Sequence, residues 1–261
     1  MGRGKKRAAA AVAVALSALV VPLAHAELTE RGDLFVRFKG GIAPTALPRT
    51  RLAPIAVSVD GTVRTLSGDR PPALRQIRIE LNRGGRLDPR GLPTCRYREL
   101  IAASPRKVLD ACEDALVGEG SYIARTAFPE QETFPSQGHI LAFNAIYQGQ
   151  SAILAHVYGH EPVPITRIIV FRIHRTGGTF GTVLTGTLPD AVNHYGYVAG
   201  IALRLFRRFD FHGRQRSYLS AACAAPPGFP SAVFPFARAS MSFADGRVLS
   251  STLTRSCRVS G

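Results

Sequence analysis

The clearest structural signal in the chain lies in residues 239–251, ASMSFADGRVLSS. Ala239, Met241 and Phe243 alternate with serines, and a second run with interleaved polar residues follows Asp245-Gly246. Alternation of apolar and polar residues has the period of a β-strand. Asp-Gly supplies the positive φ angles that a tight hairpin requires. The stretch therefore predicts an antiparallel hairpin near the C-terminus.

The same pattern recurs along the chain, with β-branched and aromatic residues between Gly, Pro and Asp. Further turns are predicted at Asp60-Gly61 and Gln148-Gly149. We expect an all-β fold, an antiparallel β-sandwich of jelly-roll type. The predicted strands are residues 33–39, 54–66, 76–83, 120–128, 139–147, 152–158, 165–175, 179–188, 197–211, 216–222, 234–243 and 247–256.

One short α-helix is predicted over residues 105–117. Ser104 can cap it, Pro105 suits its first position and Gly118 can end it. Val108, Leu109, Cys112, Ala115 and Leu116 form one apolar stripe, which directs Cys112 toward the core.

The first 26 residues have the composition of a secretory signal peptide. A positively charged start is followed by an apolar run of 16 residues, 8–23, and then by Ala24-His25-Ala26. The run falls short of the roughly 20 residues that a spanning helix needs, which argues against the alternative of an uncleaved anchor. We expect cleavage before Glu27, no membrane span afterwards, and a secreted or cell-envelope-associated protein.

The mature chain is predicted to be a single domain, residues 27–261. The alternative is two smaller sandwiches that divide near residues 129–138, within the Pro- and Glu-containing stretch FPEQETFPSQG. A single all-β domain of this length is ordinary.

Four cysteines in an exported chain predict disulfide bonds. Three pairings are possible, and we favour Cys95-Cys112 with Cys223-Cys257. The first would pin the predicted helix to the segment before it, and the second would tie the strand near Tyr218 to the last hairpin. Zinc or redox chemistry is disfavoured because the chain contains no CxxC motif.

The mature chain is basic, with 29 Lys and Arg against 18 Asp and Glu. Residues 27–98 and 163–261 carry the excess, whereas residues 99–162 are acidic. All but Lys39 and Lys107 of these basic residues are Arg. Coding bias of a GC-rich genome is one interpretation. A cationic face for phosphate or carboxylate polymers is the other, because guanidinium groups bind such groups bidentately.

Basic and aromatic residues are interleaved in residues 205–216, LFRRFDFHGRQR. We interpret this stretch as a strand that turns at His212-Gly213 into a hairpin. The predicted binding residues are Arg204, Phe206, Arg208, Arg214 and Arg216. Stacking and charge of this kind suit single-stranded nucleic acid, but export excludes that partner in vivo and favours an anionic envelope polymer or glycan. The alternative is an edge hairpin whose arginines prevent aggregation.

Enzymatic signals are weak. The chain has no Gly-x-Ser-x-Gly elbow, P-loop or dinucleotide fingerprint. His156, His160 and Glu161 could serve an extracellular hydrolase, although residues four apart on a strand lie roughly 13 Å apart, too far to share a metal ion. Paired carboxylates could cleave a glycoside, but spacing alone does not single out a pair. The candidates are Glu130 with Glu132, and Glu113, Asp114 and Glu119 around the helix end. We expect no catalytic residue, no metal and no cofactor.

Two parts of the chain resemble uncharacterised exported β-rich proteins of GC-rich Gram-positive bacteria. They run from Leu92-Pro-Thr-Cys95 to Ala115-Leu-Val-Gly118, and from Gly228-Phe-Pro-Ser-Ala-Val-Phe-Pro-Phe236 to Cys257. The resemblance implies export and paired cysteines, and no activity.

The sequence thus favours a non-enzymatic, exported binding or envelope-associated protein that contacts an anionic polymer. An extracellular hydrolase and a structural or partner-binding module are the alternatives.

Overall fold

The computed structural model describes residues 26–126, 130, 132–161, 164–189 and 196–260, and these form an all-β protein, as predicted. The signal-peptide prediction falls outside the described residues, apart from Ala26. The strands are β1 Glu27–Arg31, β2 Leu34–Ala43, β3 Ala46–Leu47, β4 Ala53–Pro54, β5 Ala56–Thr65, β6 Leu74–Asn82, β7 Gly85–Leu87, β8 Leu116–Thr126, β9 Phe134–Tyr147, β10 Gln150–Gly159, β11 Ile165–Arg175, β12 Phe180–Thr187, β13 Gly196–Leu205, β14 Arg208–Phe211, β15 Arg214–Ser217, β16 Leu219–Ala221, β17 Ser231–Phe243 and β18 Val248–Val259.

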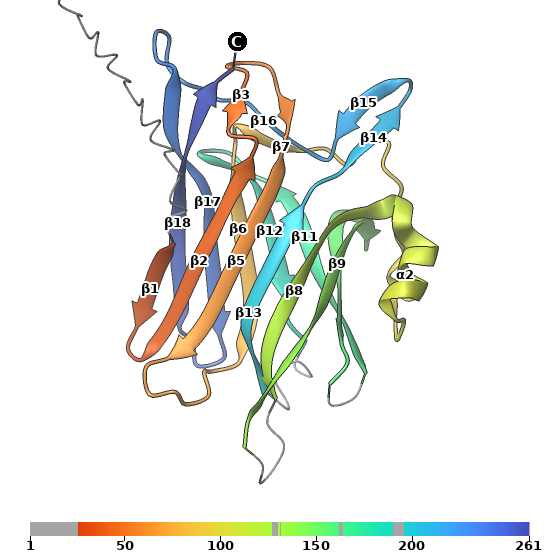
Figure 1. Ribbon diagram of the computed structural model, residues 1–261, viewed down its shortest axis with the longest axis vertical. Coiled ribbons are helices and arrows are strands. Elements are labelled where there is room, and N and C mark those ends of the chain that lie inside the picture. The colour runs from red at the N-terminus through yellow and green to blue at the C-terminus, as the bar shows by residue number, and fades with distance from the viewer. Residues whose placement is uncertain (1–25, 127–129, 131, 162–163, 190–195, 261) are drawn as a thin grey trace, which may run out of the picture.

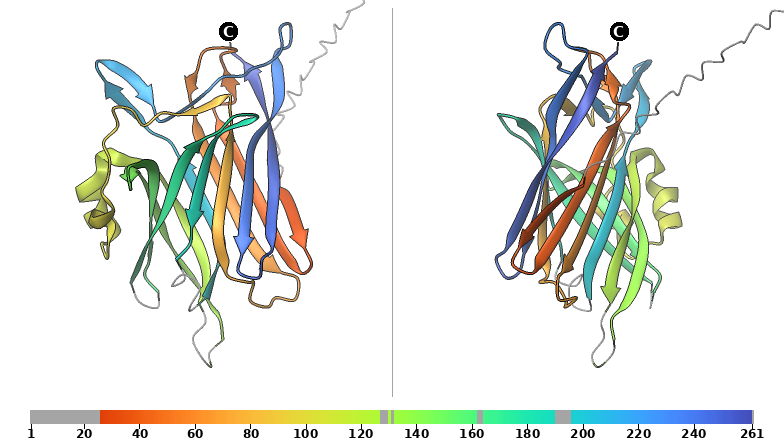
Figure 2. Two further views of the ribbon diagram at one scale, coloured as in Figure 1. Left: turned by 180° about the vertical axis from the view of Figure 1, so that it is seen from behind. Right: turned by 60° about the vertical axis from the view of Figure 1, so that its left-hand side comes forward.

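Within the described residues, thirteen strands form one sheet in the order β1-β2-β5-β13-β8-β9-β10-β11-β12-β6-β17-β18-β3. The sheet curls until its two edges, at β1-β2 and at β18, come together (Figures 1 and 2). At this seam, Arg255 of β18 donates to the Gly40 carbonyl oxygen of β2 and pairs with the Glu27 carboxylate of β1 at 2.8 Å. Two smaller sheets, β14-β15 and β4-β16-β7, lie at one end (Figure 1).

The inner face of the curled sheet forms the main hydrophobic core, which includes Val36, Ile77 and Phe236. A second core cluster lies on the outer face, where Phe143 of β9 and Leu154 of β10 pack against Val108. Val108 belongs to α2, Pro105–Cys112, which lies between α1, Tyr97–Leu100, and the 3-10 helix Glu113–Ala115. Figure 1 shows α2 outside the sheet beside β9. No helix in the described part of the chain has the length and apolar character that a membrane crossing requires.

The start of the predicted helix is confirmed and its end is wrong. Ser104 Oγ accepts a hydrogen bond from the Lys107 backbone N–H at 3.5 Å, and Pro105 is the first helical residue. The α-helix ends at Cys112 rather than at residue 117, because the fully buried Val117 already belongs to β8. A Cβ at Gly118 would lie 2.5 Å from the Arg204 carbonyl oxygen, so this glycine permits close strand packing rather than ending a helix.

The C-terminal hairpin is confirmed. β17 and β18 pair in antiparallel register with Ala239 opposite Ser251, and Gly246 has a φ of +84°. The turn at Gln148-Gly149 is also confirmed, with positive φ at both residues. The turn at Asp60-Gly61 is wrong, because both residues lie inside β5.

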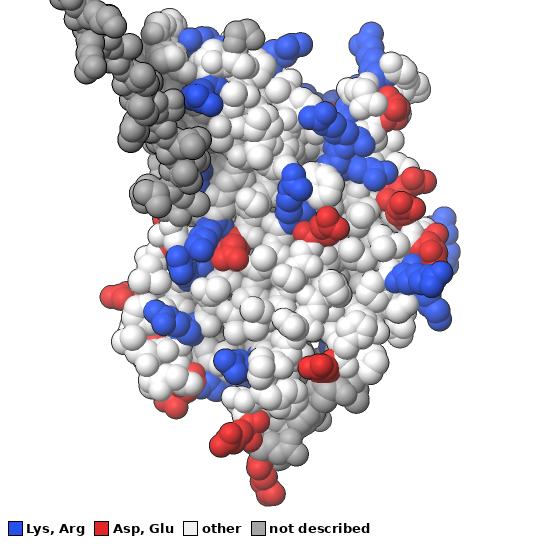
Figure 3. Space-filling view, in the orientation of Figure 1, with Lys and Arg blue, Asp and Glu red and all other residues white. Residues whose placement is uncertain are grey.

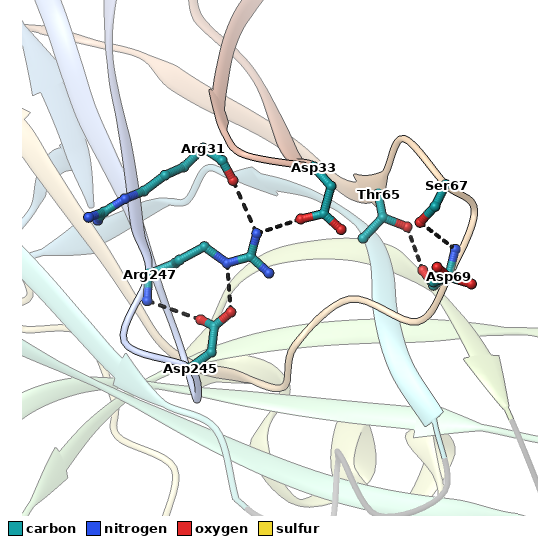
Figure 4. Close-up of polar contacts among 7 residues, drawn as sticks. All are labelled: Arg31, Asp33, Thr65, Ser67, Asp69, Asp245 and Arg247. Carbon is teal, nitrogen blue, oxygen red and sulfur yellow. Dashed lines mark hydrogen bonds and ion pairs between the residues drawn. The ribbon is translucent and has the colours of Figure 1, made fainter.

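Arg247 joins two turns at the end of the molecule opposite the small sheets (Figure 4). Its guanidinium contacts Asp33 at 2.7 Å and Asp245 at 2.6 Å, and it donates to the Arg31 carbonyl oxygen at 3.1 Å. The Asp33 hydrogen bond is the main cause of the raised pKa of Arg247, and the Asp245 hydrogen bond adds to it. One side chain thus ties the β1–β2 turn to the β17–β18 turn.

Both predicted disulfides are present. Cys95–Cys112 links the segment before α1 to the end of α2, and Cys223–Cys257 links the segment after β16 to β18, with S–S distances of 2.06 and 2.05 Å. Two disulfides fit an extracytoplasmic protein.

The alternative to a single domain, a division near residues 129–138, lies partly outside the described residues, at 129 and 131. The strands on either side, β8 and β9, pair with each other from Thr126 opposite Phe134 onward.

Candidate functional site

The basic-aromatic stretch forms a hairpin that stands apart from the large sheet. β14 and β15 pair antiparallel, and His212 and Gly213 both have positive φ, as a tight turn requires. The predicted continuous strand 197–211 is wrong, because β13 ends at Leu205 and β14 begins at Arg208.

A second predicted strand, 216–222, is likewise divided at Tyr218. The Tyr218 side chain is fully buried and its backbone N–H bonds the Arg207 carbonyl oxygen at 2.9 Å. This residue therefore anchors the base of the hairpin to the body of the protein. Burial raises the pKa of its hydroxyl, which finds no partner among the described residues.

The two faces of the hairpin differ. Arg208 points to solvent, as does Asp210, which accepts a hydrogen bond from Gln215 at 2.8 Å. Phe209 and Phe211 lie on the other face. The ring of Phe211 covers Gly91, where an added Cβ would lie 2.1 Å from a ring carbon. Gly91 is thus required both by this contact and by its φ of +83°.

Arg216 connects the hairpin to the loop after β7. Its guanidinium carbon lies 5.1 Å from the centre of the Phe211 ring, and Nη1 lies 3.6 Å from the Asp88 carboxylate. Arg90 contacts the same carboxylate at 2.9 Å and Arg86 at 3.6 Å. The hydrogen bond from the Arg90 side chain is the main cause that lowers the pKa of Asp88, against the effect of partial burial.

We call this set the arginine cluster and define it as Arg86, Arg90, Arg208, Arg214 and Arg216. Three of its guanidinium groups share one carboxylate, so positive charge remains in excess around Asp88. Arg208 and Arg214 add exposed positive charge on the hairpin. Figure 3 shows basic side chains gathered where Figure 1 places β14 and β15. Guanidinium groups so arranged suit phosphate, sulfate or carboxylate groups.

Only part of the predicted binding set lies on the hairpin. Arg208, Arg214 and Arg216 belong to it, whereas Arg204 lies at the end of β13 opposite Glu119 of β8. The guanidinium of Arg204 covers the half-exposed Phe206 ring at 4.8 Å. The sequence prediction omitted Arg86 and Arg90. The signal that could have found them is residues 83–90, RGGRLDPR, which hold three arginines and one acid.

His156, the strongest enzymatic candidate, is fully buried on the outer face beneath residue 103. Its Nε2 lies 2.9 Å from the Ala103 carbonyl oxygen and donates to it, while Nδ1 has no partner among the described residues. Burial lowers the pKa of His156, and the Ala103 hydrogen bond opposes this effect. The ring is therefore neutral and out of reach of a substrate.

The other enzymatic candidates are Tyr158, which is half-buried, and a set of exposed side chains. Tyr158 stands between the two histidines, with ring centroids 6.3 Å from His156 and 4.7 Å from His160. His160 and Glu161 are exposed. The remaining predicted carboxylates, Glu113, Asp114, Glu119, Glu130 and Glu132, are also exposed.

One group of metal-ligand side chains occurs in the described residues, Cys95, Glu99 and Cys112. Glu99 Oε2 lies 3.3 Å from Cys112 Sγ and 3.8 Å from Cys95 Sγ. Both sulfurs are joined in a disulfide, so neither is a thiolate that could bind a metal.

The fold and the candidate site define an all-β, disulfide-bonded protein with an arginine-rich surface hairpin. Comparison with protein-family models, curated proteins and solved structures found no match to this chain.

Proposed function

We propose that this is an exported, non-enzymatic binding protein that contacts an anionic polymer of the cell envelope, or an anionic glycan, through the arginine cluster. Nucleic acid is not the proposed partner, because the protein acts outside the cytoplasm. The proposal extends the predicted hairpin site to the loop after β7.

The observation that carries the proposal is the arrangement around Asp88. Arg86, Arg90 and Arg216 lie 2.9–3.6 Å from one carboxylate, which can neutralise only one of them. The excess charge is held in place, because Arg216 is fixed between Phe211 and Asp88. A prepositioned set of guanidinium groups loses less side-chain entropy on binding than a mobile one.

Export and the predicted cleavage before Glu27 are part of the proposal. Glu27 is the first residue of β1, and its carboxylate pairs with Arg255, whose side chain is 14% exposed. Cleavage after Ala26 would leave this seam contact intact. The resemblance to exported proteins of GC-rich Gram-positive bacteria agrees with this location.

We also propose that residues 27–261 are one domain whose curled sheet packs as a jelly-roll-like sandwich. Support comes from contacts across the interior between strands that are not neighbours in the sheet. A Cβ at Gly61 of β5 would lie 3.2 Å from Met241 Cε of β17.

The test is retention of purified residues 27–261 on immobilised polyphosphate and on immobilised polygalacturonate across a salt series. Binding should be strong at low salt and weaken as salt rises, because counterion release dominates such contacts. The test variant is the double substitution Arg208→Gln with Arg214→Gln, which removes two exposed charges from the hairpin. We expect the slope of log affinity against log salt to fall by about two.

The matched control is Arg37→Gln with Arg64→Gln, which makes the same change in net charge at exposed positions of β2 and β5. This control should keep nearly all retention. Equal losses in the two double variants would show that net charge alone is responsible and would contradict the proposal. Retention that does not depend on salt would favour a partner-binding module instead.

A further inference from the structure

The interior of the curled sheet contains a cavity of about 280 Å³ at the end covered by the small sheet β4-β16-β7. Its wall is mostly aliphatic and aromatic and comes from both the large and the small sheet. Representative lining residues are Ile42 of β2, Val57 of β5, Leu81 of β6, Ala221 of β16, and Phe234 and Phe236 of β17.

Two polar side chains in this wall, those of Asn82 and Thr182, already have partners. Asn82 Nδ2 donates to the Pro235 carbonyl oxygen at 2.8 Å, and its Oδ1 accepts from the Gly84 N–H at 2.8 Å. The Thr182 hydroxyl oxygen accepts from Arg175 at 2.6 Å. A molecule in the cavity would therefore be held by apolar contact rather than by these groups.

The wall segment after β16 is held in place. Cys223 is bonded to Cys257 of β18, and the guanidinium of Arg49 donates to the carbonyl oxygens of Pro226 and Phe229 at 2.6 and 3.1 Å. Because Pro226 also lines the cavity, this part of the wall is fixed. A preformed apolar space of this kind is the usual form of a small-molecule site.

The cavity reaches the surface beside two side chains of opposite character. Val233 lines it and is 75% exposed, and Arg86 lines it with its side chain 47% exposed. Arg86 lies 3.6 Å from Asp88, whereas Arg90 contacts the same carboxylate at 2.9 Å. Arg90 thus lies closer to the Asp88 carboxylate than Arg86 does, which leaves the Arg86 guanidinium able to bind a second anion.

We infer that this cavity binds a small amphiphile, an aliphatic chain with one acidic group, with the chain inside and the acid beside Arg86. The volume is roughly twice that of an engineered cavity of about 150 Å³ that binds benzene. Phe236 lines both this cavity and a second apolar cavity of about 90 Å³ deeper in the sheet. Phe236 therefore marks the inner end of the space that the aliphatic chain of the ligand occupies.

The test is a titration of the protein, ¹³C-labelled at alanine methyl groups, with sodium octanoate and separately with 1-octanol. We expect saturable shifts of the methyl resonances of Ala221 and Ala232, which line the cavity, and none at the exposed Ala244. Ala221→Leu fills the space and should weaken octanoate binding at least tenfold. Ala244→Leu is the matched control and should bind as the wild type does.

Arg86→Gln tests the position of the acid. It should weaken octanoate about fivefold and leave 1-octanol unchanged, whereas equal losses for both ligands would overturn the assignment of Arg86. The absence of saturable shifts in the wild type would overturn the whole inference. This outcome does not depend on whether Ala221→Leu folds. Arg86 belongs both to this cavity and to the arginine cluster, but the two proposals can be tested apart, because Arg208→Gln with Arg214→Gln should weaken polymer retention and leave octanoate affinity unchanged.

Discussion

Glu80 offers a direct test of how this fold uses its arginines. It lies on β6 opposite Arg238 of β17, and its side chain is 8% exposed. It accepts hydrogen bonds from Arg238 Nε and from Arg78 Nη2, the latter at 3.2 Å. The Arg238 hydrogen bond is the main cause that lowers the pKa of Glu80, although burial opposes it. We expect Glu80→Gln to reduce the free energy of unfolding at pH 7.

The size of the loss follows from the exposure of the partners. A hydrogen bond to a charged group contributes about 1.5–3 kcal/mol. The full loss of two such bonds is an upper limit, because the Arg78 and Arg238 side chains are 43% and 44% exposed and regain water. The amide oxygen of Gln still accepts one bond. We therefore expect a loss of about 1–2 kcal/mol.

The pH dependence separates charge from shape. The pKa of Glu80 is lowered in the folded state. Its contribution to the free energy of unfolding is therefore fully present above its unfolded pKa of 4.5 and is lost as pH falls through its folded pKa. The difference between wild type and Glu80→Gln, measured by urea unfolding, should therefore shrink between pH 5 and pH 2. Glu30→Gln, at an exposed position of β1, is the matched control. A constant difference over this range, or a loss no larger than that of the control, would refute the reasoning.

Three further predictions concern the disulfides, Arg247 and His156. Replacing both cysteines of Cys95–Cys112 by Ala should lower the free energy of unfolding by about 3 kcal/mol, and replacing both of Cys223–Cys257 by about 4 kcal/mol, because the two bonds close separations of 17 and 34 residues. Urea unfolding that shows no loss for either pair would contradict this. Arg247→Gln should cost about 1–2 kcal/mol and speed amide exchange in both turns that Arg247 joins, and unchanged exchange would show that it does not hold them. Burial lowers the pKa of His156 below 6.5, so the free energy of unfolding of the wild type should fall as pH drops below 6.5. Thermal unfolding of His156→Gln should lack the part of this fall that comes from His156.

The long strands could be predicted from sequence because each carries its own periodicity. β11 has the predicted bounds, Ile165–Arg175, and the C-terminal hairpin forms as its Asp-Gly turn indicates. β3, β4 and β7 have only two or three residues, too few to show a period. They exist through long-range pairing, as when Gly85 of β7 lies opposite Ala221 of β16. Asp60-Gly61 has the local preference of a turn but lies within β5. Tertiary packing overrides that preference, because Gly61 fits closely against Met241.

The candidate site could be predicted only as far as its residues are near in sequence. The turn at His212-Gly213 and the three arginines around it follow from the local pattern. Their neighbours Arg86 and Arg90 reach them through Asp88, more than a hundred residues earlier in the chain, and no local signal specifies that contact. The break in the predicted strand at residues 206–207 depends in the same way on the burial of Tyr218, whose N–H bonds the Arg207 carbonyl oxygen.

The arginine content alone does not distinguish coding bias from a binding surface, but the partners of each guanidinium do. Arg49, Arg247 and Arg255 donate to backbone carbonyl oxygens and hold loops or strands together, so their charge serves the fold. Arg78 and Arg238 share the buried Glu80. The arginine cluster differs from both groups, because three guanidinium groups surround a single carboxylate and two more lie exposed on the hairpin. Around Asp88, positive charge therefore exceeds what the one carboxylate can neutralise. Substitutions at Arg208 and Arg214 should therefore change polymer retention with little change in stability, and those at Arg247 or Arg255 should do the reverse.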